Sequence, residues 1–446
     1  MRQRVRVLIL AAIFLLSGCS IVSIDSENLL YPPRPAGEQA QIQEALEKHI
    51  GTHFTLKYPR SGDICSAITQ FDLDHDGEDE VIAFYRTKTE TGGTHFVLMD
   101  QVSGQWQVQS DLVGPGVDVD RLVITQFGEG EEKSILVGWV LFNSDKIGTV
   151  YTYRDGRIIS SLSDHIYTEM LVKDFDGDGR DELFTLLLNS SSQTSTARLF
   201  RKNSKTDLMQ VDSQLELDGN ISSYARVRFG QVETGGASGV IIDENKNATT
   251  IKTELIYWDS ELQTLVAPAF EKKQGNNGEL LRESTTLSSD ISGDGIIDIP
   301  FLERVYQYED AMDENQYVKA ESAYTRWKEY DAAKKIFVNV LDTAINYPDG
   351  YFLVIPNDYD WVQSAYFKIN KETRTMTFNN IAQDTNLFTI RVFSESEWES
   401  TGKNEYFEIT RNNGLVYGCW VSARVQSQLN GKEMDFFRKN IHLIGG

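Results

Sequence analysis

Short apolar runs, separated by polar turn residues, recur along most of the chain. Three of them, at 81–85, 183–188 and 299–302, are rich in β-branched and aromatic residues. Another, at 94–100, precedes a Ser-Gly turn and a matching run at 105–108. Apolar runs of this length between turn residues indicate strands and hairpins. The pattern therefore predicts a mainly β protein.

Two stretches depart from this pattern. At 38–50, Ile42, Ala45, Leu46 and His49 follow the i, i+3, i+4, i+7 spacing of an amphipathic helix. This helix is rich in Glu and lacks a basic face, so we expect it to pack on the protein and not on a membrane. Beyond residue 345 a different strand-rich unit begins, with a closing helix expected at 431–444. Its strand candidates are 351–356, 365–369, 375–378, 387–393, 406–410 and 415–421.

Three copies of one acidic loop precede the three apolar runs. Each has oxygen-bearing side chains at positions 1, 3, 5 and 9 and glycine at position 6. Such side chains can converge on one hard cation at roughly 2.3–2.6 Å, and the glycine permits the sharp bend. The loops therefore predict up to three structural calcium sites. The expected ligands are Asp72, Asp74, Asp76 and Glu80 in the first loop, Asp174, Asp176, Asp178 and Glu182 in the second, and Asp290, Ser292, Asp294 and Asp298 in the third.

The spacing differs from that of an EF-hand, which needs a bidentate acid at position 12 and a helix on each side. Position 12 is Ala83, Thr185 and Phe301 in the three copies, and a strand pattern follows each loop. The loops therefore connect strands. Because Ser292 replaces a carboxylate, we expect the third site to be the weakest.

Two acid-poor echoes of the loop extend the repeat. Taking 72, 128, 174, 230 and 290 as equivalent positions gives spacings of 46–60 residues, which suit four-stranded blades. Calcium is then expected in the first, third and fifth blades.

At this point the chain resembles the FG-GAP or VCBS-type repeats of integrin-like β-propellers, whose blades carry a D-x-D-x-D-G-x-x-D calcium loop. The resemblance implies a propeller of about six or seven blades over 51–345, in which calcium stiffens the blades. The unit at 346–446 is faintly similar to PsbP-like domains, and that similarity assigns no residue a role.

The N-terminus has the features of an export signal. Arg2, Arg4 and Arg6 precede an apolar core at 7–15, which is short for a membrane span, and Leu-Ser-Gly-Cys19 follows. This resembles a bacterial lipobox, which implies that 1–18 is removed, that Cys19 is lipidated, and that 19–37 is a tether. The protein would then be anchored on the non-cytoplasmic side of a membrane. A plain secretory signal or an N-terminal anchor helix is the alternative, and either also exports the protein.

Composition limits the partners. The formal net charge is −23, which argues against nucleic acid and anionic lipid surfaces. Besides Cys19, only Cys65 and Cys419 are present. They could form a disulfide that clamps the C-terminal region to the first blade, or remain two buried thiols.

No motif for catalysis is found. The six histidines are scattered without metal-ligand spacing, and His75 stands at a non-ligand position of the first loop. Walker, dinucleotide, nucleophile-elbow and zincin motifs are missing from the sequence. We therefore expect a non-enzymatic binding, adhesion or scaffold protein with an unidentified protein or glycan partner. The alternative is a cell-envelope hydrolase or lyase carried on the propeller.

Overall fold

The computed structural model describes residues 37–87, 92–129, 132–154, 156–232, 236–268, 280–303, 324–356 and 365–444. The expected signal peptide, Cys19 and nearly all of the tether lie outside these residues. The chain divides into two compact units. One is Met1–Tyr58, Ser66–Asp72 and Asp76–Gly114, and the other is Pro59–Cys65, Leu73–His75 and Pro115–Gly446.

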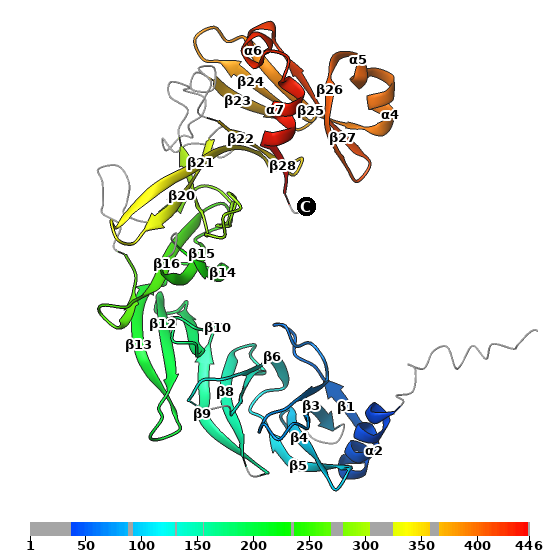
Figure 1. Ribbon diagram of the computed structural model, residues 1–446, viewed down its shortest axis with the longest axis vertical. Helices are drawn as coiled ribbons and strands as arrows, with labels where there is room; N and C mark the ends of the chain where they lie inside the picture. Colours follow the sequence, from blue (N-terminus) through cyan, green and yellow to red (C-terminus); the bar gives the residue numbers. More distant parts are fainter. Residues whose placement is uncertain are drawn as a thin grey trace, which may run out of the picture. The chain divides into compact units, whose positions relative to one another are not determined.

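The first unit is one antiparallel sheet with a helix packed on it (Figure 1). Helix α2 covers Glu38–Ile50, the range predicted from its apolar stripe. Its buried Ile42 and Leu46 pack in one cluster with Val81, Val97 and Trp106, so the helix lies on the sheet as expected. The strands are β1 (Phe54–Lys57), β2 (Ile68–Phe71), β3 (Glu80–Thr87), β4 (His95–Val102) and β5 (Gln105–Val113).

The sheets of the second unit are numbered in chain order from the second to the sixth. In the second, third and fourth sheets, the first four strands form a meander in which neighbours in sequence pair. The second sheet is β6 (Asp118–Thr125), β7 (Ser134–Val140), β8 (Lys146–Arg154) and β9 (Arg157–Tyr167). The third is β10 (Glu169–Lys173), β11 (Glu182–Asn189), β12 (Thr194–Lys202) and β13 (Met209–Asp218). The fourth is β14 (Ser223–Gln231), β15 (Ser238–Asn245), β16 (Ile251–Asp259) and β17 (Thr264–Val266), with β18 (Leu280–Arg282) also pairing with β16.

Apolar side chains join successive sheets of this unit. Phe184 and Leu199 of the third sheet share one core cluster with Val240 and Ile256 of the fourth. Another cluster, which includes Ile241 and Ile299, joins the fourth and fifth sheets. Burying such side chains on both sides of a sheet explains why these strands are continuous apolar runs.

The fifth sheet is β19 (Ile299–Glu303), β20 (Tyr324–Asp331), β21 (Ile336–Asn346), β22 (Tyr351–Ile355) and β28 (Ile441–Leu443). The sixth has the order β23 (Ala365–Asn370), β24 (Thr375–Asn380), β25 (Asn386–Ser394), β27 (Leu415–Val421) and β26 (Phe407–Asn412). Between β25 and β26 lie α4 (Glu395–Glu397), the π-helix η2 (Trp398–Gly402) and α5 (Lys403–Glu405), and α6 (Ala423–Leu429) and α7 (Glu433–Asn440) follow β27.

The closing helix is shorter than the sequence predicts. Within 431–444 the helix α7 ends at Asn440, and the next three residues form β28, which pairs with β22. Both cysteines outside the signal region are free thiols, Cys65 exposed and Cys419 buried. The disulfide alternative is therefore wrong, and the buried-thiol alternative holds for Cys419 alone.

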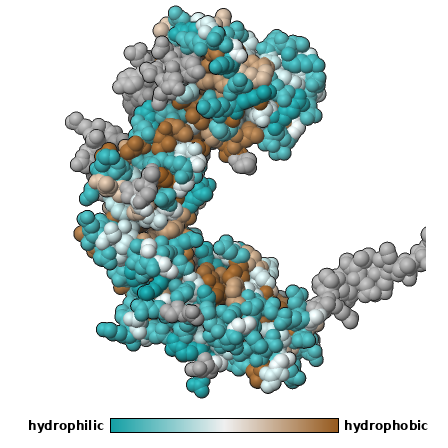
Figure 2. Space-filling view, in the orientation of Figure 1, coloured by the Kyte–Doolittle hydropathy of each residue, from teal (hydrophilic) through white to brown (hydrophobic). Residues whose placement is uncertain are grey.

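On the visible face, the surface is mostly hydrophilic with separate apolar patches (Figure 2), in keeping with the acidic composition. Among the described residues, no helix is long and apolar enough to cross a membrane.

Candidate metal centre

Each acidic loop lies just before the strand that the sequence predicts. The first, 72–80, connects β2 to β3, the second, 174–182, connects β10 to β11, and the third, 290–298, leads into β19. Glycine at position 6 has a left-handed backbone in all three loops, with φ of 89°, 86° and 92° at Gly77, Gly179 and Gly295. The bend inferred from this glycine is confirmed.

Backbone N–H groups hold the first carboxylate of the second and third loops in the same way. Asp174 accepts bonds from Gly177 N at 2.7 Å and Gly179 N at 2.9 Å. Asp290 accepts the equivalent bonds from Gly293 N at 2.7 Å and Gly295 N at 3.0 Å. The two loops therefore share one backbone geometry.

The acid at position 9 closes each loop from the start of the following strand. Glu182 accepts a bond from Phe175 N at 2.8 Å, and Asp298 accepts one from Ile291 N at 2.9 Å. Glu80, Glu182 and Asp298 are 1%, 2% and 0% exposed. Burial disfavours a charged carboxylate, so it raises the pKa of Glu182 from 4.5 to about 7 and also raises that of Asp298.

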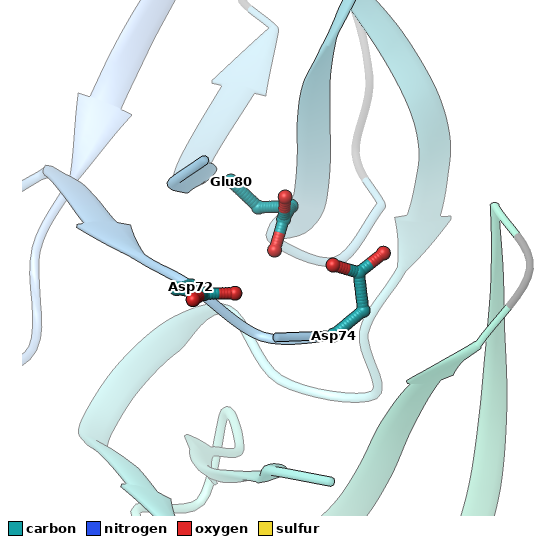
Figure 3. Close-up of side chains that lie close together, drawn as sticks. All are labelled: Asp72, Asp74 and Glu80. Carbon is teal, nitrogen blue, oxygen red and sulfur yellow. The ribbon is translucent and has the colours of Figure 1, made fainter. Parts of the chain in front are cut away.

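Two of the three loops bring three carboxylates together. One oxygen each from Asp72, Asp74 and Glu80 lies within 4.8 Å of the others, and the same holds for Asp174, Asp176 and Glu182. Figure 3 shows the first set, with two carboxylates from the loop and one from the start of β3 directed toward a shared space. The groups consist of positions 1, 3 and 9, three of the four positions that the sequence names as ligands.

Position 5 makes the same backbone contact in each loop. Asp76, Asp178 and Asp294 each accept a bond from the backbone N–H two residues later, at 2.8, 2.9 and 2.9 Å. These aspartates are not members of the two groups of three. Among the described residues, the three aspartates of the third loop do not form such a group either. Ser292 instead donates to Asp290 across 3.5 Å.

Two side chains that the sequence did not indicate also reach the loops. Arg201 of β12 donates to Asp176 at 2.7 Å and lies 3.8 Å from Glu182. Glu329 of β20 lies opposite Asp298, because Ile299 pairs with Lys328, and the charges of Asp294 and Asp298 act on its carboxyl group. Burial, followed by these two acids, raises the pKa of Glu329 from 4.5 to about 7. The second loop thus has a cation beside it, and the third loop has an extra acid beside it.

The second loop borders an open hollow of about 850 Å³. Its lining includes Asp174, Asp176, Trp258 and Lys335. The ring of Trp258 also lies 4.5 Å from the Arg201 guanidinium, so the hollow, the loop and this cation are contiguous.

The donor set fits a hard divalent cation. Every predicted side-chain ligand offers oxygen, which calcium prefers and which zinc or copper sites seldom use alone. In the third loop, Oδ1 of the fully buried Asp298 has no hydrogen-bond partner among the described residues. A buried carboxylate oxygen without a donor is costly, and a bound cation would remove that cost.

No family model and no curated protein sequence matches the chain. Among solved structures, it is similar to Sqt1 from Saccharomyces cerevisiae, with 12% identity, 77% of this chain and 84% of that chain covered, and a TM-score of 0.27. It is also similar to fructan 1-exohydrolase IIa from Cichorium intybus, with 9% identity, 73% and 61% covered, and a TM-score of 0.27. A Bacteroides fragilis protein of unknown function matches at 8% identity, 50% and 92% covered, and a TM-score of 0.18. Superpositions this loose do not define the fold, so the likeness to FG-GAP repeats rests on the loops.

Proposed function

We propose that the chain is an exported, lipid-anchored β-propeller of the FG-GAP or VCBS type, which binds calcium in its acidic loops. In this proposal it is a non-enzymatic binding or scaffold module for a protein or glycan partner. The observation that carries the calcium assignment is the convergence of carboxylates from positions 1, 3 and 9 in two separate loops.

The sheet order supports the propeller. Consecutive four-stranded meanders that pack through their faces are the arrangement of propeller blades. The acid-poor echoes fall near the same place in their sheets as the acidic loops do, since Gly128 lies between β6 and β7 and Gly230 lies near the end of β14.

Calcium would stabilise these loops because it neutralises carboxylates that repel one another. The first and second loops each direct three acids toward one space, and like charges at this separation are unfavourable without a cation. An exported protein meets calcium concentrations that suit weak sites, with Kd values of roughly 10⁻⁴ to 10⁻³ M. The proposed role of the ion is structural.

The hollow beside the second loop is the proposed contact surface for the partner. Its lining combines loop carboxylates with Trp258 and Lys335, a mixture of polar and aromatic groups that suits a glycan or a peptide. Asp259, which also lines it, accepts bonds from Glu261 N at 2.9 Å and Leu262 N at 3.0 Å. These acids therefore hold turns and loops, which favours binding over acid–base catalysis.

Calorimetric titration of the chelator-stripped mature protein tests the assignment. We expect calcium heat in the millimolar range or below and a melting temperature that rises with calcium. Absence of both up to several millimolar would refute it. A glycan array and a pull-down with the mature protein then search for the partner. Cys19→Ser should move the protein from the membrane to the soluble fraction, and unchanged membrane association would contradict lipid anchoring.

A further inference from the structure

One position on the neighbouring strand faces the position-9 acid of every loop. In the third sheet Leu183 pairs with Phe200, so the antiparallel ladder places Glu182 opposite Arg201. In the first sheet Val81 pairs with Met99, so Glu80 lies opposite Asp100. In the fifth sheet Ile299 pairs with Lys328, so Asp298 lies opposite Glu329. The facing residues are Asp100, Arg201 and Glu329 in the first, second and third loops.

The facing residue matters most in the third loop, which has Ser292 in place of a carboxylate. Glu329 is half-buried there, and the register of β19 with β20, in which Ile299 pairs with Lys328, places it opposite Asp298. Burial, followed by the charges of Asp294 and Asp298, raises its pKa. Independently, Oδ1 of the fully buried Asp298 has no hydrogen-bond partner in the described part of the chain. Both observations point to a cation position between β20 and this loop.

We infer that Glu329 is a metal ligand of the third loop and supplies the carboxylate that Ser292 lacks. The inference rests on the proposed calcium binding and adds to it a ligand from outside the repeated motif. With Glu329 the third loop has four carboxylates, Asp290, Asp294, Asp298 and Glu329, which equals the number in the first loop. The third site is then not the weakest of the three.

The second loop provides the natural contrast. Its facing residue, Arg201, contacts Asp176 at 2.7 Å and Asp212 at 2.9 Å. A guanidinium neutralises part of the charge that calcium would neutralise, and it repels the ion. The facing position thus has opposite charge in two loops of otherwise similar geometry, and the second loop becomes the weakest calcium site.

The test isolates the third loop within the full mature chain. Asp72→Ala and Asp174→Ala disable the other two loops, and calcium affinity is then measured by calorimetry with and without Glu329→Gln. We expect Glu329→Gln to weaken calcium binding at least tenfold. Asp331→Asn is the matched control, because it removes the same charge from the end of the same strand, where Lys334 is its ion-pair partner. That variant should bind within twofold of its parent.

A second measurement separates a ligand from a structural residue. Without calcium, Glu329→Gln should leave the melting temperature unchanged or higher, because it removes one of several like charges. With calcium, its melting temperature should rise less than that of the parent. Ser292→Asp added to Glu329→Gln should restore the affinity, because it returns a carboxylate to the loop.

Each other outcome is decisive. Equal calcium affinity with and without Glu329→Gln, in a chain that binds calcium, overturns this inference and leaves the proposed function standing. A lower melting temperature without calcium, together with an unchanged calcium-dependent rise, also overturns it by showing a structural role. A wild-type chain that binds no calcium overturns both.

Discussion

Replacing Arg201 with Gln should destabilise the calcium-free protein and tighten calcium binding at the second loop. Arg201 donates to Asp176 at 2.7 Å, forms an ion pair with Asp212 at 2.9 Å, and lies over Trp258. Hydrogen bonds between charged groups contribute about 1.5–3 kcal/mol and a cation–π contact about 0.5–1 kcal/mol. Since the side chain is 27% exposed, screening reduces these values. We expect a loss of about 2 kcal/mol in the free energy of unfolding.

The effect on calcium follows from Coulomb's law. An ion bound to Asp176 would lie about 5 Å from the guanidinium, given ligand distances of roughly 2.3–2.6 Å. With full water screening, a divalent and a monovalent cation at this separation repel by about 1.7 kcal/mol. Removing Arg201 should therefore tighten calcium binding by at least about tenfold.

The assay is calorimetric titration in a chain whose other loops are disabled by Asp72→Ala and Asp290→Ala. Arg201→Lys serves as the control, because it keeps the charge and loses the planar two-pronged geometry. It should keep the parent's calcium affinity within a few-fold. If Arg201→Gln binds calcium no more tightly than Arg201→Lys, the guanidinium does not compete with the ion and the reasoning fails.

Four further predictions concern the second loop. Asp174→Ala should lower stability without calcium, by about 0.5–1.5 kcal/mol for each of its two backbone bonds, and also reduce the calcium-dependent rise in melting temperature. Asp181→Asn, whose parent carboxylate accepts a bond from Thr125, should leave that rise intact, and an equal reduction would contradict the ligand pattern. Gly179→Ala should cost about 1–2 kcal/mol in chemical denaturation, because φ is 86° and the added Cβ meets no neighbour within 4 Å; a neutral result would show that the loop relaxes. With burial raising the pKa of Glu182 to about 7, the folded state binds more protons than the unfolded state between pH 4.5 and 7. Stability without calcium should therefore fall as pH rises through that window. Chemical denaturation at several pH values checks this, and if the free energy of unfolding of Glu182→Gln falls with pH as steeply as that of the parent, other groups cause the fall.

The sequence predicted the elements whose causes are local. Helix α2 begins and ends where the apolar stripe of Ile42 and Leu46 indicates, and strands β3, β11 and β19 contain the apolar runs that follow the loops. The expected closing helix was wrong at its C-terminal end. Residues 441–443 form β28 because they pair with β22, far away in sequence, and such pairing overrides local propensity.

The candidate site shows the same division. Positions 1, 3 and 9 were predictable because one short loop carries them at fixed spacing. Arg201 and Glu329 were not, because each belongs to the next strand, and only the ladder register places it opposite Glu182 or Asp298. A motif read along the chain therefore finds the ligands of a loop but misses the cross-strand residue that sets its charge.

The acid-poor second sheet indicates why the position-9 acid depends on its neighbours. There the residue equivalent to Glu80 is Ser134, which pairs with Thr125 as Glu80 pairs with Phe71 and is equally buried. Its cross-strand partner is the neutral Thr152. A buried acid at this position would carry a desolvation cost. A loop without converging carboxylates holds no cation that could offset this cost. The buried acid is present in the three loops that carry the motif carboxylates and is replaced by a hydroxyl in this loop, where they are missing, which is the pattern expected if these acids hold the proposed ion.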